Sequence, residues 1–235
     1  MNSRGYVLLF CSLFCAAVSV HANFKVEPAV LVLNVSVGEM NGFVEIENLS
    51  KEPRAVEFAM FDRALDLDGE LDRNAKVKSN DFIIYPSEII IKPNEKATVQ
   101  LKYAKKERLR VDKAYLLFSK EVLIPVGEDD EEEINIKIPV TVSYYSIVAL
   151  ETGKEGKISF VSSKALGNNM VEVIAENTGS GRYLVDNLAI QTSTDIIRNL
   201  SGKKNSIMPG QRRRFTFKYM RPLTSKEVKF IYVPD

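Results

Sequence analysis

Hydrophobic and polar residues alternate along most of this chain, which predicts β-strands. The clearest alternation spans residues 134–145. In an extended chain successive side chains point to opposite faces, so this segment predicts a long strand with one apolar face. Pro139 has no amide hydrogen to give to a sheet ladder, which favours a sheet edge or a bulge. The apolar face consists of Ile134, Ile136, Ile138, Val140 and Val142.

A run of six acidic residues, 128–133, precedes this strand. We interpret the run as a solvated loop that discourages aggregation of the strand behind it. The alternative is that its negative charge steers a basic protein partner toward the strand. A β-branched edge strand beside a block of charge is therefore either a protected edge or a docking surface.

The same alternation predicts further strands before this one. Pro28 interrupts the first, as expected of a strand that bends or changes sheets. Residues 62–80 are rich in charge and predict a loop or an irregular hairpin, and residues 104–111 are the one candidate for a helical turn. About seven strands in all are expected of an immunoglobulin-like sandwich. The segments are 24–27, 29–37, 43–49, 54–61, 82–85, 89–91, 97–103 and 114–124.

The pattern breaks around residues 149–157, in a short, charged segment that contains glycine and suits a linker. Shorter strand patterns follow it, which predicts a second and smaller β-sandwich. The fold class predicted from sequence is therefore all-β, with an N-terminal domain over 23–149 and a C-terminal domain over 150–235. The later strand patterns are 157–161, 170–176, 183–191, 213–219 and 228–233.

Residues 1–22 have the pattern of a secretory signal peptide. Arg4 precedes an apolar run from Tyr6 to Val20, and cleavage is expected after Ala22. The run is short for a membrane span, and no later segment is long and apolar enough to be one. We therefore expect an exported protein without membrane insertion.

Removal of that segment changes the chemistry available to the mature chain. Both cysteines, Cys11 and Cys15, and the single histidine, His21, lie inside it. The usual zinc ligands, thiol nucleophiles and imidazole bases leave with them, so we expect no metal and no cofactor. The 32 basic residues less Arg4 leave 31, which balance 31 acids and give no reason to propose nucleic acid as a partner.

An enzyme is the least favoured class. Ser, Lys, Asp and Glu remain available, but the sequence has no Gly-x-Ser-x-Gly elbow and no phosphate-binding loop in a strand–turn–helix setting. A structural or adhesive surface protein built from two exported sandwich domains stays open, because a fold does not by itself fix a function.

Five segments, in order along both halves of the chain, resemble periplasmic pilus-assembly chaperones of the chaperone–usher family. The resemblance leans toward the archaic and alternate branches of that family. Each segment alone is a weak pattern, and the specificity comes from five in register after a signal peptide. The segments are Phe24-Lys25-Val26-Glu27-Pro28, 85–99, 115–121, Asn177-Thr178-Gly179 and 208–214.

The resemblance implies a boot of two immunoglobulin-like domains with a cleft between them. It also implies a periplasmic protein that binds incomplete pilus or fimbrial subunits by donor-strand complementation and delivers them to an outer-membrane usher. The strand that this chain would lend is 134–145, with Ile134, Ile136, Ile138, Val140 and Val142 as the subunit-binding residues.

The chain departs from the family at the anchor for the subunit's terminal carboxylate. The family's basic pair falls near Val30 and Thr141, and neither of these is basic. A main-chain anchor and a different docking register are equally open. The sequence also leaves open the cognate subunit, the organism and whether the free protein self-associates. The substitute cations are Lys25, Lys137 and Arg182.

Three smaller expectations concern turns and a basic run. Asn94 stands where the family commonly has glycine, a tolerable change because Asn also visits positive φ. The acidic segment 66–70 predicts a polar turn, since it lacks the spacing of a calcium loop. Arg212-Arg213-Arg214 is interpreted as the solvent-facing start of a strand.

Overall fold

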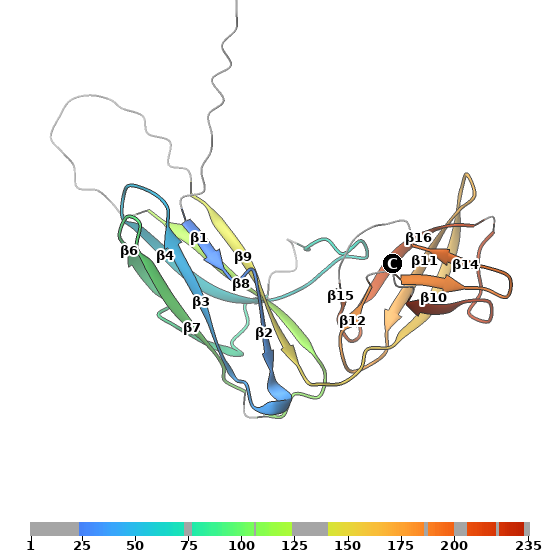
Figure 1. Cartoon of the computed structure of the whole chain (residues 1–235), viewed down its shortest axis with the longest axis horizontal. Helices are drawn as coiled ribbons and strands as arrows, with labels where there is room; N and C mark the ends of the chain where they lie inside the picture. The colour runs from blue at the N-terminus through green and yellow to red at the C-terminus, as the bar shows by residue number, and fades with distance from the viewer. Residues whose placement is uncertain are drawn as a thin grey trace, which may run out of the picture.

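The chain folds into two lobes built of β-strands (Figure 1). This computed structural model describes residues 24–72, 77–105, 107–123, 141–185, 188–199, 206–219 and 221–232. The predicted signal peptide and most of the predicted strand 134–145 lie outside these ranges. Within the described residues, no helix has the length and apolar character needed to cross a membrane.

The first lobe is a sandwich of two sheets, with strand orders β1-β3-β7-β5 and β2-β9-β8-β4-β6. Side chains from both sheets form one core, which includes Phe24, Val44 and Leu101 from one sheet and Met60 and Leu150 from the other. The elements are β1 (Phe24–Glu27), β2 (Val30–Asn34), a 3-10 turn η1 (Val35–Val37), β3 (Asn41–Asn48), β4 (Arg54–Asp62), β5 (Phe82–Tyr85), β6 (Glu88–Ile91), β7 (Lys96–Tyr103), β8 (Lys113–Val122) and β9 (Ser143–Glu151).

The first strand changes sheets at Pro28, as the sequence predicts. β1 pairs antiparallel with β3 in the four-stranded sheet. β2 pairs parallel with β9 at the edge of the other sheet. The break at Pro28 therefore allows one N-terminal segment to contribute an edge strand to each sheet of the sandwich.

Several smaller predictions about turns and strand ends can be compared with the structure. The helical turn predicted over 104–111 is wrong, because the described residues of that segment form no helix. Residues 62–72 form the predicted irregular hairpin, with an isolated bridge between Leu65 and Leu71. Asn94 has a φ of 58°, the left-handed conformation expected of it. β9 continues to Glu151, so the strand runs past the predicted boundary at residue 149.

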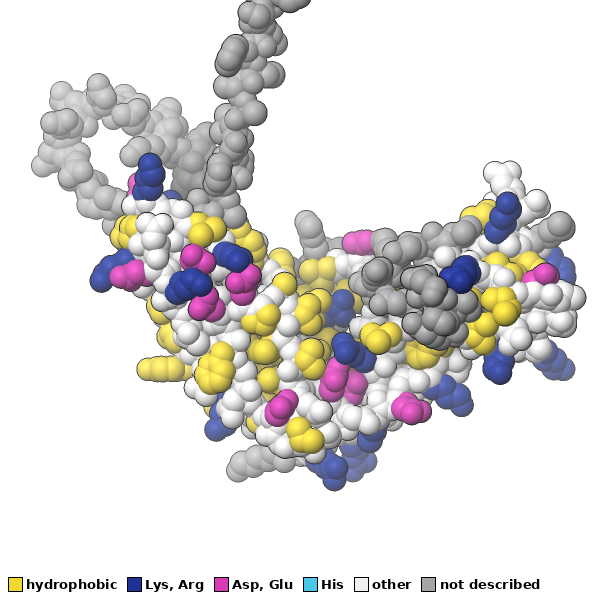
Figure 2. Space-filling view, viewed as in Figure 1, with side chains coloured by type: hydrophobic (Ala, Val, Ile, Leu, Met, Phe, Trp, Pro, Cys, Tyr) yellow, Lys and Arg dark blue, Asp and Glu magenta, His cyan; other side chains and the backbone are white. Residues whose placement is uncertain are grey.

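The second lobe is smaller, and its sheets have the orders β10-β11-β16, β14-β13-β17 and β12-β15. Val171, Val173, Phe215 and Phe217 of the first of these pack with Ile190 from β13 in a separate core. The strands are β10 (Ile158–Gly167), β11 (Met170–Asn177), β12 (Tyr183–Leu184), β13 (Leu188–Gln191), β14 (Ile196–Arg198), β15 (Ser206–Ile207), β16 (Arg212–Lys218) and β17 (Lys229–Tyr232). The all-β, two-domain fold class is confirmed, and Figure 2 shows the surface hollowed between the lobes.

The buried carboxylate of Asp112, which is 5% exposed, joins the lobes. Its Oδ1 accepts hydrogen bonds from the main-chain N and the Oγ1 of Thr152, both at 2.7 Å. Its Oδ2 accepts from the main-chain N of Arg182 at 2.9 Å, and its own N donates to the Ser180 carbonyl. Gly181 lies so close that a Cβ there would overlap the Lys154 carbonyl oxygen. The connection between the lobes therefore depends on the Asp112 carboxylate and on the absence of a side chain at Gly181.

Replacing Asp112 by Ala is expected to loosen the linker, because the main-chain amides of Thr152 and Arg182 lose their acceptor. The expected cost is about 2–4 kcal/mol, from bonds to a charged group and from buried donors left unmade. Trypsin cleavage within residues 152–157 should accelerate, while Glu107→Ala, an exposed change in the preceding loop, should leave the rate unchanged. Equal cleavage of the two variants would contradict this role.

A second connection is made by residues 62–72, which we call the interdomain arm. It reaches from the end of β4 to the second lobe (Figure 1). The main-chain N of Arg214 donates to the Leu67 carbonyl at 2.7 Å, and Nη1 of Arg214 lies 3.3 Å from Oδ2 of Asp68. The Asp66 carboxylate accepts from the amides of Asp68 and Glu70, which makes the arm's tip the predicted polar turn.

The basic run at 212–214 contains a buried arginine, which corrects the expectation that the run faces solvent. Arg213 is 4% exposed and lies on the same face of β16 as Phe215 and Phe217, inside the second lobe. Its Nη2 donates to the Ser206 carbonyl at 3.4 Å.

Candidate protein-binding edge

Among the described residues, only part of one side of β9 has a neighbouring strand. β8 pairs with β9 from Ser143 to Leu150. On the opposite side β2 pairs only with residues 147–151, and no other described strand continues β2 alongside Ser143 and Tyr144. The amide and carbonyl groups of an open sheet edge are a template for pairing with another chain. This part of β9 is the C-terminal end of the strand predicted over 134–145.

β2 carries exposed apolar side chains beside that edge. Val30 is 49% exposed and Val32 is 40% exposed, whereas Leu33 on the alternate face is 3% exposed. β2 has no charged residue of the kind that commonly protects an edge strand. The edge therefore combines an open main chain with a β-branched surface, which suits a protein partner.

A buried charge network fixes the point where the chain enters β9. Glu121 on β8 is 1% exposed, and its Oε1 accepts from Nη1 of Arg54 at 2.7 Å. Its Oε2 accepts from the main-chain N of Val142 at 3.2 Å, and its own N donates to the Val142 carbonyl at 3.0 Å. Both main-chain groups of Val142 are thus held by one glutamate. The strand start is fixed immediately after the predicted lending segment.

Most of the predicted subunit-binding residues lie outside the described ranges. Val142 is described, and its half-buried side chain packs against the core of its own lobe. The residues that lie outside the described ranges are Ile134, Ile136, Lys137, Ile138 and Val140.

The two described candidates for a carboxylate anchor already have acidic partners. Nζ of Lys25 lies 2.7 Å from Oε1 of Glu27 on the same strand. Nη2 of Arg182 lies 2.7 Å from Oε1 of Glu151 beside the linker. Each cation is therefore neutralised locally, and its role in binding a subunit stays a prediction.

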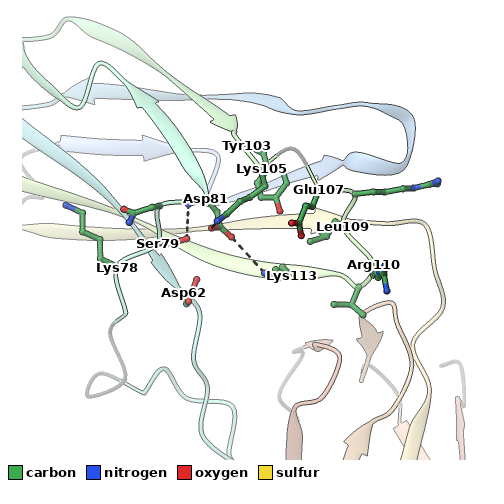
Figure 3. A pocket seen from close by; sticks show the side chains of 13 residues that line it. Asp62, Lys78, Ser79, Asp81, Tyr103, Lys105, Glu107, Leu109, Arg110 and Lys113 are labelled. Atoms are coloured by element: carbon green, nitrogen blue, oxygen red, sulfur yellow. Dashed lines mark hydrogen bonds and ion pairs between the residues drawn. The ribbon is translucent and has the colours of Figure 1, made fainter.

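A pocket of about 830 Å³ lies at one end of the first lobe (Figure 3). Its central carboxylate, Asp81, accepts a hydrogen bond from the Tyr115 hydroxyl at 2.8 Å. Nζ of Lys105 lies 3.2 Å from Asp81, and Nζ of Lys113 lies 3.9 Å from it. The described residues contain no cluster of acids, His or Cys that could hold a metal ion. Because Asp81 is satisfied by its own chain, we assign it a structural role.

Stability is expected to depend on pH through Asp81. Burial raises the pKa of its carboxyl, but hydrogen bonds from Tyr115 and Lys105 and the charges of Lys105 and Lys113 lower it below the ordinary 3.8 overall. A folded-state pKa below the unfolded value gives stability that is present above the unfolded pKa and lost as pH falls through the folded pKa.

Replacing Asp81 by Asn should therefore cost about 1–2 kcal/mol at pH 7 and progressively less as the pH approaches 3. Urea midpoints of the two proteins at a series of pH values measure the difference. Glu88→Gln, an exposed change on β6, should show no such convergence. A constant gap between Asp81→Asn and the parent would exclude the carboxylate's charge as the cause.

The comparisons with known proteins are structural. No protein-family model matches the sequence, and no curated protein sequence matches it either. Among solved structures, the class 5 fimbriae chaperone CfaA aligns with a TM-score of 0.55, at 14% identity, over 90% of this chain and 100% of that chain. The E. coli chaperone DraB aligns with a TM-score of 0.52, at 10% identity, over 88% of this chain and 87% of that chain.

A chain of the CsuC–CsuE chaperone–tip adhesion subunit pre-assembly complex of Acinetobacter baumannii aligns with a TM-score of 0.51. Its identity is 13%, and the alignment covers 83% of this chain and 90% of that chain. The chain has the two-domain fold of pilus chaperones. At these identities the likeness concerns the fold, and both lobes of the chaperone fold are included in the alignments.

Sequence reasoning missed the buried charges that organise this edge. Glu121 follows Tyr115, Leu117 and Ser119 at every second position of β8, and all four are buried. The alternation therefore gave a usable signal, because it places the carboxylate of Glu121 on the core-facing side of β8. Its partner Arg54 lies 67 positions away in the sequence, so spacing alone does not reveal the pair.

Proposed function

We propose that this protein is a periplasmic chaperone for pilus or fimbrial subunits and that it binds them by lending them the strand over 134–145. The supporting observation is the half-covered edge of β9, which lies in a chaperone fold and leads directly into that alternating segment. A subunit would add its own strands along the open main chain and the lent segment.

Side-chain parity supports the same proposal. Tyr144, Val148 and Leu150 of β9 face the core, and all three have even numbers. The apolar residues of 134–142 are also even-numbered, so an uninterrupted alternation would place them on the same face of the strand. Val142 itself packs against the lobe's own core. Residues before it would carry a core-type face beyond their own domain, where a partner's core would cover it.

The expected affinity is large enough for a stable complex. Burying Ile134, Ile136, Ile138 and Val140 in a partner contributes about 1.5–3 kcal/mol each, or about 6–12 kcal/mol in gross terms. The costs of association and ordering reduce this figure. Main-chain hydrogen bonds along the strand add to it and favour any subunit that lacks a strand there.

The proposal includes the later steps of assembly. The chaperone would act as a non-enzymatic protein without ATP or metal, and it would release its subunit at an outer-membrane usher when another subunit's extension replaces the lent strand. This exchange requires a strand that binds by addition and can be displaced. A structural or adhesive surface protein with the same fold would instead remain in the fibre.

Co-expression tests the proposal. The mature chain and a candidate subunit encoded beside it should elute together from size-exclusion chromatography as a soluble 1:1 complex, and the subunit alone should aggregate. Purified fibres should lack the chain. Recovery of the chain as a stoichiometric fibre component would overturn the proposal and favour a structural protein.

A further inference from the structure

The five-stranded sheet is apolar on its outer face as well as on its core-facing side. Strand alternation places Met60, Leu117 and Val148 in the core, so the residues between such positions lie on the opposite face. The registers of β4, β8, β9 and β2 align these outer residues in rows across the sheet. The first row is Phe61, Leu116, Ile147 and Val30, and the second is Ala59, Phe118 and Tyr145.

The two rows pack together into one surface. The ring of Phe118 lies beside those of Phe61 and Tyr145, with centroids 6.0 Å and 5.0 Å away. Leu116, in the middle of the first row, is 6% exposed, whereas Tyr145 is 38% exposed and Val30 is 49% exposed. The apolar surface is therefore most accessible at the sheet edge, along β2 and the open part of β9.

Polar residues bound this surface at both ends. In the next row beyond Phe118, Glu57 and Lys120 lie directly opposite each other, and both are exposed. At the other end, Glu151 of β9 forms an ion pair with Arg182. The two rows themselves contain no charged residue. An anion docked on them would find no counterion within the rows, so the surface suits an apolar group.

The second row ends at the open edge of β9. Val30 is the first residue of β2 and pairs with Ile147, so β2 supplies no residue beside Tyr145. No other described strand lies there. A strand added to this edge would place one side chain beside Tyr145, where directly opposite Cβ atoms are about 4.5–5.5 Å apart. The added strand would therefore supply the fourth residue of the row.

We propose that Tyr145 and Val30 select the pilus subunit by packing against a large apolar side chain of the strand that it adds to β9. This inference rests on the proposed function, because the added strand is the subunit's. It concerns the opposite face from the lent row, since the lent residues share the parity of the core and Tyr145 has the other parity. Aromatic and β-branched residues are the cross-strand partners that stabilise such a pair.

Competition for a limiting amount of subunit measures this selection. The urea-unfolded subunit is diluted into an equimolar mixture of 15N-labelled parent and unlabelled variant, and native mass spectrometry gives the final ratio of the two complexes. Tyr145→Ser should lose at least tenfold against the parent, and Val30→Ser at least threefold, because each removes apolar surface from the rows. The control Phe43→Ser removes a 56% exposed ring from β3 in the other sheet and should compete within twofold.

A cation tests the chemistry of the contact. Tyr145→Lys should also lose at least tenfold, because its ammonium group would be desolvated against an apolar side chain. Tighter binding of this variant than of the parent would show that the subunit presents an anionic group there, and it would overturn the inference.

Further outcomes separate this inference from the proposed function. If Tyr145→Ser competes equally with the parent while replacement of both Ile136 and Ile138 by Asp abolishes the complex, strand lending stands and only the inference falls. A parent that forms no complex removes both. Val30→Ser, at a 49% exposed position, keeps the test decisive if the urea midpoint shows that Tyr145→Ser is destabilised. Equal competition by Val30→Ser would then overturn the inference.

Discussion

Replacing both Ile136 and Ile138 by Asp is expected to abolish the proposed complex with a pilus subunit while the protein stays folded. The change removes two apolar side chains from the proposed interface, worth about 3–6 kcal/mol together. That loss alone weakens binding by about 10²–10⁴-fold. The two carboxylates would also have to enter an apolar groove without partners, which adds to the loss. Co-purification and titration calorimetry with the subunit measure the effect.

A matched variant separates the apolar face from the charge itself. Asn135→Asp with Ser143→Asp adds the same two charges on the alternate, polar face, and it should bind within about tenfold of the parent. A complex of unaltered affinity in the isoleucine variant would exclude strand lending. An unfolded isoleucine variant would show that the row belongs to the protein's own core.

Replacing Arg54 by Ala is expected to destabilise the first lobe by about 2–4 kcal/mol. The change removes the guanidinium that pairs with Glu121, whose side chain is 1% exposed. Breaking a buried pair typically costs 3–5 kcal/mol, and the 23% exposure of the Arg54 side chain reduces this figure. Because Glu121 also holds both main-chain groups of Val142, the start of β9 should loosen at the same time.

Urea unfolding measures this loss, and two variants check its cause. Glu52→Ala removes the exposed partner that lies 3.5 Å from Arg54 and should cost less than about 1 kcal/mol. Adding Glu121→Gln to Arg54→Ala should recover part of the loss, because a neutral amide does not need a counterion. Equal destabilisation by Arg54→Ala and Glu52→Ala would show that the buried pair does not stabilise the lobe.

The sequence predicts the fold class because strand alternation and proline are local signals. The period of two identifies β3, β4, β7 and β8 within a residue or two at most described ends. Pro28 predicts the change of sheets because a residue without an amide hydrogen interrupts a ladder wherever it stands. The short strands β14 and β15, of three and two residues, carry too few positions to show a period.

The buried charges could not be predicted, because their partners are distant in the chain. Alternation places Glu121 and Arg213 on core-facing rows but says nothing of Arg54 or Ser206. Asp112 lies in a loop, where no period exists, and its partners come from the linker and from the second lobe. Charged residues are usually exposed, so from sequence alone these residues are expected at the surface. Only the packing of the two lobes shows that Glu121, Arg213 and Asp112 are buried.

The candidate edge could be predicted from the sequence only in part. Alternation defines the apolar face of 134–142 fully from sequence, and the structure adds the open side of β9 and the fixed position of Val142. Period-two alternation identifies a face, but it does not identify which molecule covers that face. The parity shared with Val148 and Leu150 is physically consistent with a core that continues from one protein into the next.

Hydrogen–deuterium exchange of the mature protein, alone and with its subunit, tests the lent strand most directly. The account predicts that main-chain amides over 134–141 exchange rapidly in the free protein and at least 100-fold more slowly in the complex, because they become ladder donors to the subunit. Equal protection of these amides in the free and bound states would contradict the account.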